Sequence, residues 1–362
     1  MPQFELPDLL EIETARNRIG AHAHWTPLLS SRSIGELAKT DVWLKCENLQ
    51  KAGAFKFRGA MNACLRAVEE ERMPAAGVIT FSSGNHGQAV ALAARTLGID
   101  ATIVVPEDIP TVKRAAIESY GARLEIAGLT STDRHQRALG ISEENGGLII
   151  PPFDHPDVIA GQGTTGLEII DELPEADAIL VPTGGGGLLA GVAIALSHRN
   201  PSTRVIAVEP TDANAMALSV EAGEIVTLDK VPGTIADGLK PMAPGELTLE
   251  AAIEHVDRVL LVDDDSILRA QRLLLERAKL TSGTTWHSAA QVRQLCRAGS
   301  HTPRRLTRVC RQLTTGGIAK KSCTTPRAGA SLLLAGMQPD QVVQALSSSL
   351  SFSATQSEMA IE

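Results

Sequence analysis

The sequence predicts an α/β protein with two open, mostly parallel twisted sheets that carry helices on both faces. From about residue 76, short apolar runs alternate with helical stretches, which is the order of parallel strands joined by crossover helices. The apolar runs lack strict apolar–polar alternation, as expected of strands buried on both faces. A chain of 362 residues also exceeds one ordinary core and indicates two domains.

The individual elements follow in a regular order. Seven short runs rich in β-branched residues predict strands at 76–81, 101–106, 122–128, 147–152, 178–183, 204–210 and 258–264. The stretches between them predict helices from about His86, at 111–121, from about Gln162, at 187–198, up to about Ala222, and at 266–280. The strand–helix alternation therefore continues through most of the chain.

Composition and charge exclude several functional classes. A net charge of −8 and an aromatic content of 3% argue against a nucleic-acid partner or an anionic membrane surface. No apolar run approaches the roughly 20 residues that span a bilayer. The acidic N-terminus lacks the pattern of a signal peptide, and five cysteines without CxxC spacing indicate reduced thiols. We therefore predict a cytoplasmic protein that acts on a small molecule.

A lysine in an aromatic setting is the first candidate for chemistry. Lys56 stands between Phe55 and Phe57, and Gly53 and Gly59 bracket the group. Desolvation by such neighbours disfavours the ammonium form and lowers the pKa of a lysine, which is how a lysine becomes a nucleophile.

The stretch SSGNHG is the second candidate, because it follows a predicted strand and opens a predicted helix. Ser82, Ser83, Asn85 and His86 then lie at the carboxyl edge of a parallel strand, where open α/β sheets bind ligands. The N–H groups of the helix can bind a carboxylate or a phosphate. The alternative is an ordinary Ser/Asn helix cap.

Four consecutive glycines at 184–187 form the third candidate, again between a strand and a helix. Without Cβ atoms, the backbone amides can close around a phosphate. A rival interpretation is a dinucleotide fold, since Gly185, Gly187 and Ala190 satisfy G-x-G-x-x-A and Glu209 ends the next strand. That interpretation, an NAD-binding oxidoreductase, gives Lys56 no role.

The three motifs together resemble those of the fold-type II, tryptophan-synthase-β-like family of pyridoxal-phosphate (PLP) enzymes, most closely the serine racemases and serine/threonine dehydratases. The resemblance runs from about His24 to Leu280. The matching words are TPLLSS (26–31), KCENLQKAGAFKFRGA (45–60), SSGNHGQA (82–89), VVPEDIP (104–110), VIAGQGT (158–164), VPTGGGGLLAG (181–191), EPTDANAM (209–216) and TIADGLK (234–240).

The resemblance implies a domain division and a reaction. Residues 1–70 and 152–330 would form a large PLP-binding domain and 71–151 a small domain, with PLP between them and 331–362 as a tail without an assigned structure. The implied activity is a PLP-dependent ammonia-lyase (serine/threonine dehydratase) that converts a β-hydroxy amino acid to a 2-oxo acid and ammonia. The alternative is a racemase of serine or a related amino acid that uses Lys56 and Ser83. Relatives also suggest a homodimer.

The resemblance also implies cofactor-binding residues. Lys56 would form a Schiff base with PLP and then remove the Cα proton. Phe55 would pack against the ring, and Asn85 would bind its 3-hydroxyl. The phosphate would bind the loop that consists of Gly184, Gly185, Gly186 and Gly187.

Substrate and metal residues follow from the same resemblance. Ser82, Ser83 and His86 would surround the substrate carboxylate, with Ser83 exchanging a proton on the face opposite Lys56 in racemases. Arg134 would clamp the substrate in a closed state, unless it is an ordinary solvated arginine. Glu209 matches the first acid of a magnesium or calcium site, although the expected second acid is Ala215.

The C-terminal part departs from the family. Residues 1–280 carry a net charge of −14 and residues 281–362 a net charge of +6. Where relatives carry a serine facing the pyridine nitrogen, Thr315 stands among basic residues. The codons of Thr281 to His287, started one base later, can encode the family's Leu-Val-Glu-Pro-x-Gly motif. We therefore hypothesise that the chain is out of frame from about Thr281, which would leave a PLP-binding protein of impaired activity; a divergent tail is the alternative, and the gene sequence distinguishes them.

Overall fold

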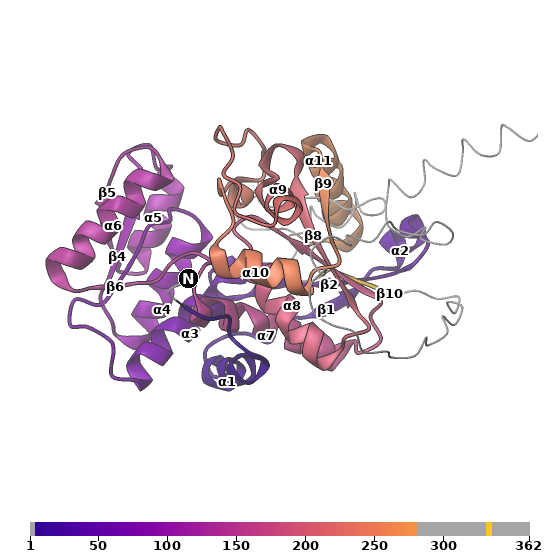
Figure 1. Ribbon diagram of the computed structural model, residues 1–362, viewed down its shortest axis with the longest axis horizontal. Helices are drawn as coiled ribbons and strands as arrows, with labels where there is room; N and C mark the ends of the chain where they lie inside the picture. The colour runs from indigo at the N-terminus through magenta and orange to yellow at the C-terminus, as the bar shows by residue number, and fades with distance from the viewer. Residues whose placement is uncertain (1–3, 281–330, 335–362) are drawn as a thin grey trace, which may run out of the picture.

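The computed structural model describes residues 4–280 and 331–334, and in this part of the chain the strands form two separate sheets (Figure 1). Thr315 and nearly all of the segment after Leu280 lie outside the described residues. No helix of the described part is long and apolar enough to cross a membrane.

The larger sheet has six strands in the order β1-β2-β10-β7-β8-β9. Their bounds are β1 Leu28–Ser30, β2 Asp41–Lys45, β7 Ala178–Pro182, β8 Arg204–Pro210, β9 Arg258–Val262 and β10 Ser331–Leu334. Among the described strands of this sheet, only the β1–β2 pair is antiparallel. Strand β10 comes from the segment that the sequence left as an unassigned tail, and it pairs in parallel with both β2 and β7.

The smaller sheet has four strands, all parallel, in the order β5-β4-β3-β6. Their bounds are β3 Val78–Thr80, β4 Ala101–Val105, β5 Arg123–Ile126 and β6 Leu148–Ile149. The two sheets confirm the predicted fold class, and each of the seven predicted strands is present within its predicted run.

Helices cover both faces of the larger sheet, which explains its continuous apolar strands. On β7, Ile179 and Val181 pack with the core under α1, α7, α8 and α10, whereas Ala178 and Leu180 pack with the core under α2 and α11. The helices are α1 Leu9–Ile19, α2 Arg32–Ala38, α3 Lys56–Glu69, α4 Asn85–Leu97, α5 Thr111–Ser119, α6 Ser131–Asn145, α7 Pro156–Glu172, α8 Gly187–Arg199, α9 Ala215–Ala222, α10 Glu246–His255 and α11 Asp264–Leu273. The short turns are η1 Glu47–Leu49, η2 Lys51–Gly53, η3 Thr211–Ala213, η4 Asp237–Leu239 and the π-helical η5 Leu274–Ala278.

Helix α7 begins earlier than the sequence predicts, at Pro156 instead of about Gln162. His155 caps it by accepting a hydrogen bond from the Asp157 amide, and Pro156 occupies the first turn, where its missing N–H costs nothing. Helix α7 packs closely against α3 and α8 through small residues. A Cβ on Gly161 would lie 2.6 Å from the Cα of Gly59, so the glycines permit close helix packing here.

Candidate active site

Lys56 is the first residue of α3, directly after a turn in which Ala52 and Gly53 have positive φ angles of 57° and 69°. Its Nζ donates a hydrogen bond to the carbonyl oxygen of Pro152 at 2.5 Å and lies 5.2 Å from the centre of the Phe55 ring. Burial of the amine lowers the pKa of Lys56 from 10.5 to about 8. At neutral pH a larger fraction of this amine is therefore uncharged, and able to act as a nucleophile, than in a lysine with the ordinary pKa of 10.5.

The β3–α4 loop lies next to Lys56 through His86. The Nε2 of His86 lies 3.0 Å from the carbonyl oxygen of Ile150, so Nε2 carries the hydrogen and Nδ1 keeps its lone pair. Burial and the nearby positive charge of Lys56 lower the pKa of His86 to about 3, while its bond to Ile150 opposes this shift. His86 is therefore neutral, and its buried Nδ1 has no partner among the described residues.

The glycine loop of residues 184–187 connects β7 to α8. Gly186 has a φ of 90°, which favours glycine, and a Cβ on Gly185 would lie 2.2 Å from the Phe153 ring. The amide of Ala190 makes the bond to the carbonyl of Gly186 that starts α8. The amides before Ala190 have no acceptor within the helix, and such amides are suited to an anion.

A connecting segment, residues 150–154 between β6 and α7, brings these parts together. Along it, the carbonyl of Ile150 contacts His86, the carbonyl of Pro152 accepts from Lys56, and the ring of Phe153 covers the glycine loop. Next, the carboxylate of Asp154 accepts hydrogen bonds from the first amides of α10. The sequence PPFD carries no motif, and the contacts that make it part of the site are with residues far along the chain, so the segment could not be found from the sequence.

A buried ion-pair network supports the start of α3 from behind. Arg58, which is 1% exposed, binds both carboxylate oxygens of Glu47 and both of Glu168. Lys45 adds a second cation, 2.8 Å from Glu168, and Thr26 donates to Glu47. Lys45 also pairs with the partly exposed Glu172 at 3.1 Å, so every buried charge in the network has an opposite partner, which is the condition under which buried charges are tolerated. None of these residues is predicted from the sequence to support the site.

Four further predicted residues lie on α6, in the β3–α4 loop and at the start of α4. Arg134 lies on α6, half-buried, and its guanidinium donates to the carbonyl of Leu129. Burial lowers the pKa of Arg134. Ser82 lies after β3, where its hydroxyl accepts from the Gly84 amide; Ser83 follows it, and Asn85 begins α4. The substrate contacts of Arg134, Ser82 and Ser83, the cofactor contact of Asn85 and the role of Thr315 stay predictions.

Glu209 ends β8 in a buried position, and its two carboxylate oxygens accept hydrogen bonds from the amides of Met216 and Ala217 at 3.0 and 2.8 Å. Burial raises the pKa of Glu209 to about 8, although these two bonds oppose the shift. A hard cation needs several oxygen ligands. Among the described residues Glu209 belongs to no cluster of three acidic, histidine or cysteine side chains that could hold a metal ion.

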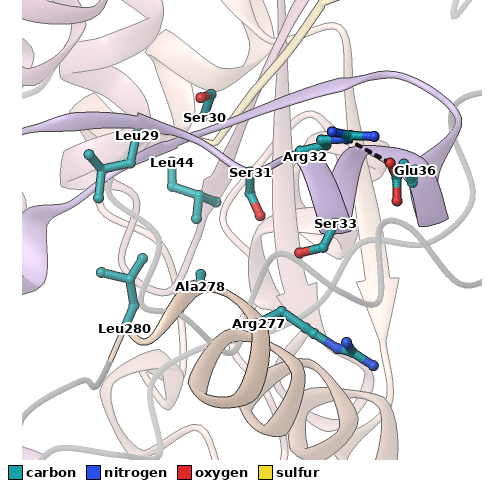
Figure 2. Close-up of a pocket in the computed structure, with 10 residues that line it drawn as sticks. All are labelled: Leu29, Ser30, Ser31, Arg32, Ser33, Glu36, Leu44, Arg277, Ala278 and Leu280. Atoms are coloured by element: carbon teal, nitrogen blue, oxygen red, sulfur yellow. Dashed lines mark hydrogen bonds and ion pairs between the residues drawn. The ribbon is translucent and has the colours of Figure 1, made fainter.

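A pocket of about 520 Å³ lies elsewhere, between the β1–α2 connection and the end of η5 (Figure 2). Its lining includes Ser31, Arg32 and Arg277, and Arg32 forms an ion pair with Glu36 at 2.9 Å. None of its lining residues belongs to the β3–α4 loop, the glycine loop or the connecting segment. The pocket is therefore separate from the candidate active site.

The arrangement around Lys56 fits PLP. A desolvated lysine amine can react with the cofactor's aldehyde, and the amides at the start of α8 can bind its phosphate. The connecting segment contacts both groups, so the lysine and the loop belong to one site.

Comparisons with known proteins show the family of the chain. The family model for pyridoxal-phosphate dependent enzymes matches residues 19–310. The L-threo-3-hydroxyaspartate ammonia-lyase of Saccharomyces cerevisiae is 43% identical over 275 residues, which cover 76% of this chain and 83% of that protein. The serine racemase of Schizosaccharomyces pombe is 43% identical over 275 residues, covering 76% and 84%. The structure of maize serine racemase superposes with a TM-score of 0.73 at 39% identity, covering 78% of this chain and 87% of that one.

Proposed function

The chain belongs to the pyridoxal-phosphate dependent enzyme family, and from this premise we propose that it is an ammonia-lyase for a β-hydroxy amino acid. The proposed reaction breaks the Cα–H and Cβ–O bonds, releases the β-hydroxyl as water and consumes one water to give a 2-oxo acid and ammonia. The family match favours PLP over the NAD alternative, which left Lys56 without a role.

One observation carries the proposal: Lys56 and the glycine loop meet at the same connecting segment. The carbonyl of Pro152 holds the Lys56 amine, and the next residue, Phe153, packs on Gly185. A lysine with a pKa of about 8 can react with an aldehyde near neutral pH and can later take up a proton.

The bound cofactor supplies an electron sink that acidifies the substrate Cα–H. Lys56 is placed to remove that proton once its amine is free. His86 stays neutral because of its low pKa, so it adds no positive charge to the site. The starts of α4 and α8 present amides for the substrate carboxylate and the cofactor phosphate.

The direct test is an activity assay on the purified full-length protein. We expect an absorbance band near roughly 410–420 nm from cofactor bound to lysine, together with 2-oxo acid and ammonia in equal amounts from L-serine, L-threonine or L-threo-3-hydroxyaspartate. A protein that binds PLP but releases neither product from any of the three would contradict the proposed reaction.

A racemase is the second candidate, favoured by the similarity to the serine racemase of Schizosaccharomyces pombe. Ser83 lies in the β3–α4 loop, where it could exchange a proton on the face opposite Lys56. We predict that Ser83→Ala loses interconversion of D- and L-serine while keeping part of the elimination from L-serine, as measured by chiral chromatography beside the ammonia assay. Equal loss of both activities would show that Ser83 only binds the carboxylate.

Further properties stay predictions with their own tests. The homodimer rests on the family resemblance, and light scattering measures it directly. The cytoplasmic location is supported by the free thiols of Cys46 and Cys64 and is tested by cell fractionation.

For a magnesium or calcium ion at Glu209, a change in melting temperature on adding either ion or EDTA would support the site, and no change would leave Glu209 as the cap of α9.

A further inference from the structure

Thr248, in the first turn of α10, is fully buried against the glycine loop. Its Oγ1 lies 2.8 Å from the carbonyl oxygen of Gly185 and 3.2 Å from that of Gly245, and it accepts a hydrogen bond from the Gly245 amide at 2.9 Å. A hydroxyl has one proton, so the shorter contact indicates that Thr248 donates to Gly185. The side chain thereby joins the loop to the start of α10.

Asp154 fixes the same end of α10. Its carboxylate accepts hydrogen bonds from the amides of Glu246, Leu247 and Thr248 at 2.9, 3.1 and 3.3 Å. A negative charge at this end of a helix is stabilised by the free amides there. A Cβ at position 245 would lie 2.0 Å from the Asp154 carboxyl carbon, so only Gly245 permits this approach. Asp154 therefore sets the position from which Thr248 reaches the loop.

The orientation of one peptide group follows from these contacts. In a trans peptide the C=O and the next N–H point in opposite directions. Thr248 holds the carbonyl of Gly185, and the N–H of Gly186 in the same peptide group is then directed away from Thr248. Gly186 itself has the positive φ of 90° that this turn requires.

We propose that Asp154 and Thr248 are positioning residues that orient the amides of the glycine loop for the cofactor phosphate. Neither needs to touch the cofactor, since both act through the backbone of Gly185. The inference rests on the proposed function, which assigns the phosphate to this loop. It adds that α10 and the connecting segment, on which Lys56 also depends, set the geometry of that loop.

The test compares PLP with pyridoxal, which has the aldehyde but no phosphate, on the full-length protein freed of cofactor. Thr248→Val keeps the shape of the side chain and removes the hydroxyl. We expect its affinity for PLP to fall about five- to tenfold, the usual effect of one hydrogen bond, while its affinity for pyridoxal stays unchanged. Thr248→Ser should restore the affinity for PLP.

Thr203→Val is the matched control. Thr203 is buried and donates to the carbonyl of Ala176, so this variant loses the same kind of bond away from the loop. The ratio of the affinity for PLP to the affinity for pyridoxal is compared between the two variants. If this ratio is the same in Thr248→Val and Thr203→Val, the proposal is overturned and Thr248 has a role in folding alone.

Asp154→Asn keeps the test decisive if Thr248→Val does not fold. In this variant a single amide oxygen must accept the hydrogen bonds that three amides now donate to two carboxylate oxygens. We therefore expect a weaker preference for PLP over pyridoxal. An unchanged preference would contradict the proposal. A wild-type protein that binds both compounds equally would instead refute the phosphate role of the loop itself, and with it this inference.

Discussion

At the scale of single residues, Lys56 differs from other lysines in its surroundings. Its amine is desolvated and hydrogen-bonded to the carbonyl of Pro152. Lys51, five residues earlier, also lies over an aromatic ring, with its Nζ 5.7 Å from the centre of Phe57. An aromatic neighbour alone therefore does not identify the reactive lysine. The connection to the glycine loop does so, because it places the amine where a phosphate-bearing aldehyde would bind.

We predict that Lys56→Ala loses the absorbance band of lysine-bound cofactor and all ammonia release. Lys51→Ala is the control, because it removes a lysine next to Phe57 and leaves the contact with Pro152 intact. Absorbance spectra and ammonia assays of both variants measure this. A Lys56→Ala protein that keeps both the band and the activity would mean that another lysine carries the cofactor.

The lowered pKa of Lys56 predicts a pH dependence of cofactor capture. Only the uncharged amine reacts with an aldehyde, and its fraction rises with pH through a pKa of about 8 instead of 10.5. The rate at which cofactor-free protein takes up PLP should therefore rise with a midpoint near pH 8 and level off above it. His86 contributes no step in this range, because its pKa is about 3. Stopped-flow absorbance measures the rate, and a midpoint near 10.5 would disprove the desolvation of Lys56.

At the scale of elements, α3 begins at the reactive lysine and depends on a buried charge network two residues further on. Arg58 joins α3 to η1 through Glu47 and to α7 through Glu168. A network of this kind contributes little net stability, yet removing one member leaves buried charges without a partner. The position of Lys56 is therefore sensitive to residues that never reach the site.

We predict that Arg58→Met lowers the free energy of unfolding by about 3–5 kcal/mol, since Glu47 and Glu168 lose their shared cation. The control is Arg114→Met, whose exposed ion pair with Glu118 should contribute less than about 1 kcal/mol. Urea denaturation of both variants provides the comparison. Similar losses in the two variants would show that the network carries no special cost when it is broken.

At the scale of the whole molecule, an ion pair joins the part around the smaller sheet to the edge of the glycine loop. Lys113 of α5 lies 2.6 Å from Asp237 of η4. The same turn packs on the loop, since a Cβ on Gly184 would lie 3.1 Å from the Cα of Leu239. The pair thus connects α5, which packs near the smaller sheet, with the turn that packs on the glycine loop.

We predict that Lys113→Met raises the KM for the amino-acid substrate by up to about fivefold, the effect of one partly exposed ion pair. Salt screens such a pair, so the KM of the wild type should rise with ionic strength, and that of Lys113→Met should not. Lys113→Arg, which keeps the charge, is the control. Initial rates at several salt concentrations test this, and parallel salt curves for wild type and Lys113→Met would exclude a role for the pair.

The sequence by itself determined the fold class, all seven predicted strands and the three motifs around Lys56, Ser83 and Gly185. Each of these depends on short-range properties: apolar runs for buried strands, and glycines or small polar residues where a strand gives way to a helix. The same reasoning placed the start of α7 six residues late and missed α10. The carboxylate that caps α10 belongs to Asp154, 92 residues before the amide of Glu246.

Only the tertiary structure decided how these pieces meet. The contacts that define the site join Lys56 to Pro152 across 96 residues, His86 to Ile150 across 64 and Arg58 to Glu168 across 110. Such contacts leave no periodic pattern or motif in the sequence. The local sequence around one residue does not depend on which distant residue it contacts. Strand β10 shows the same limit, since its place between β2 and β7 follows from sheet pairing. Local chemistry sets which residues can react, and chain packing sets which of them face one another.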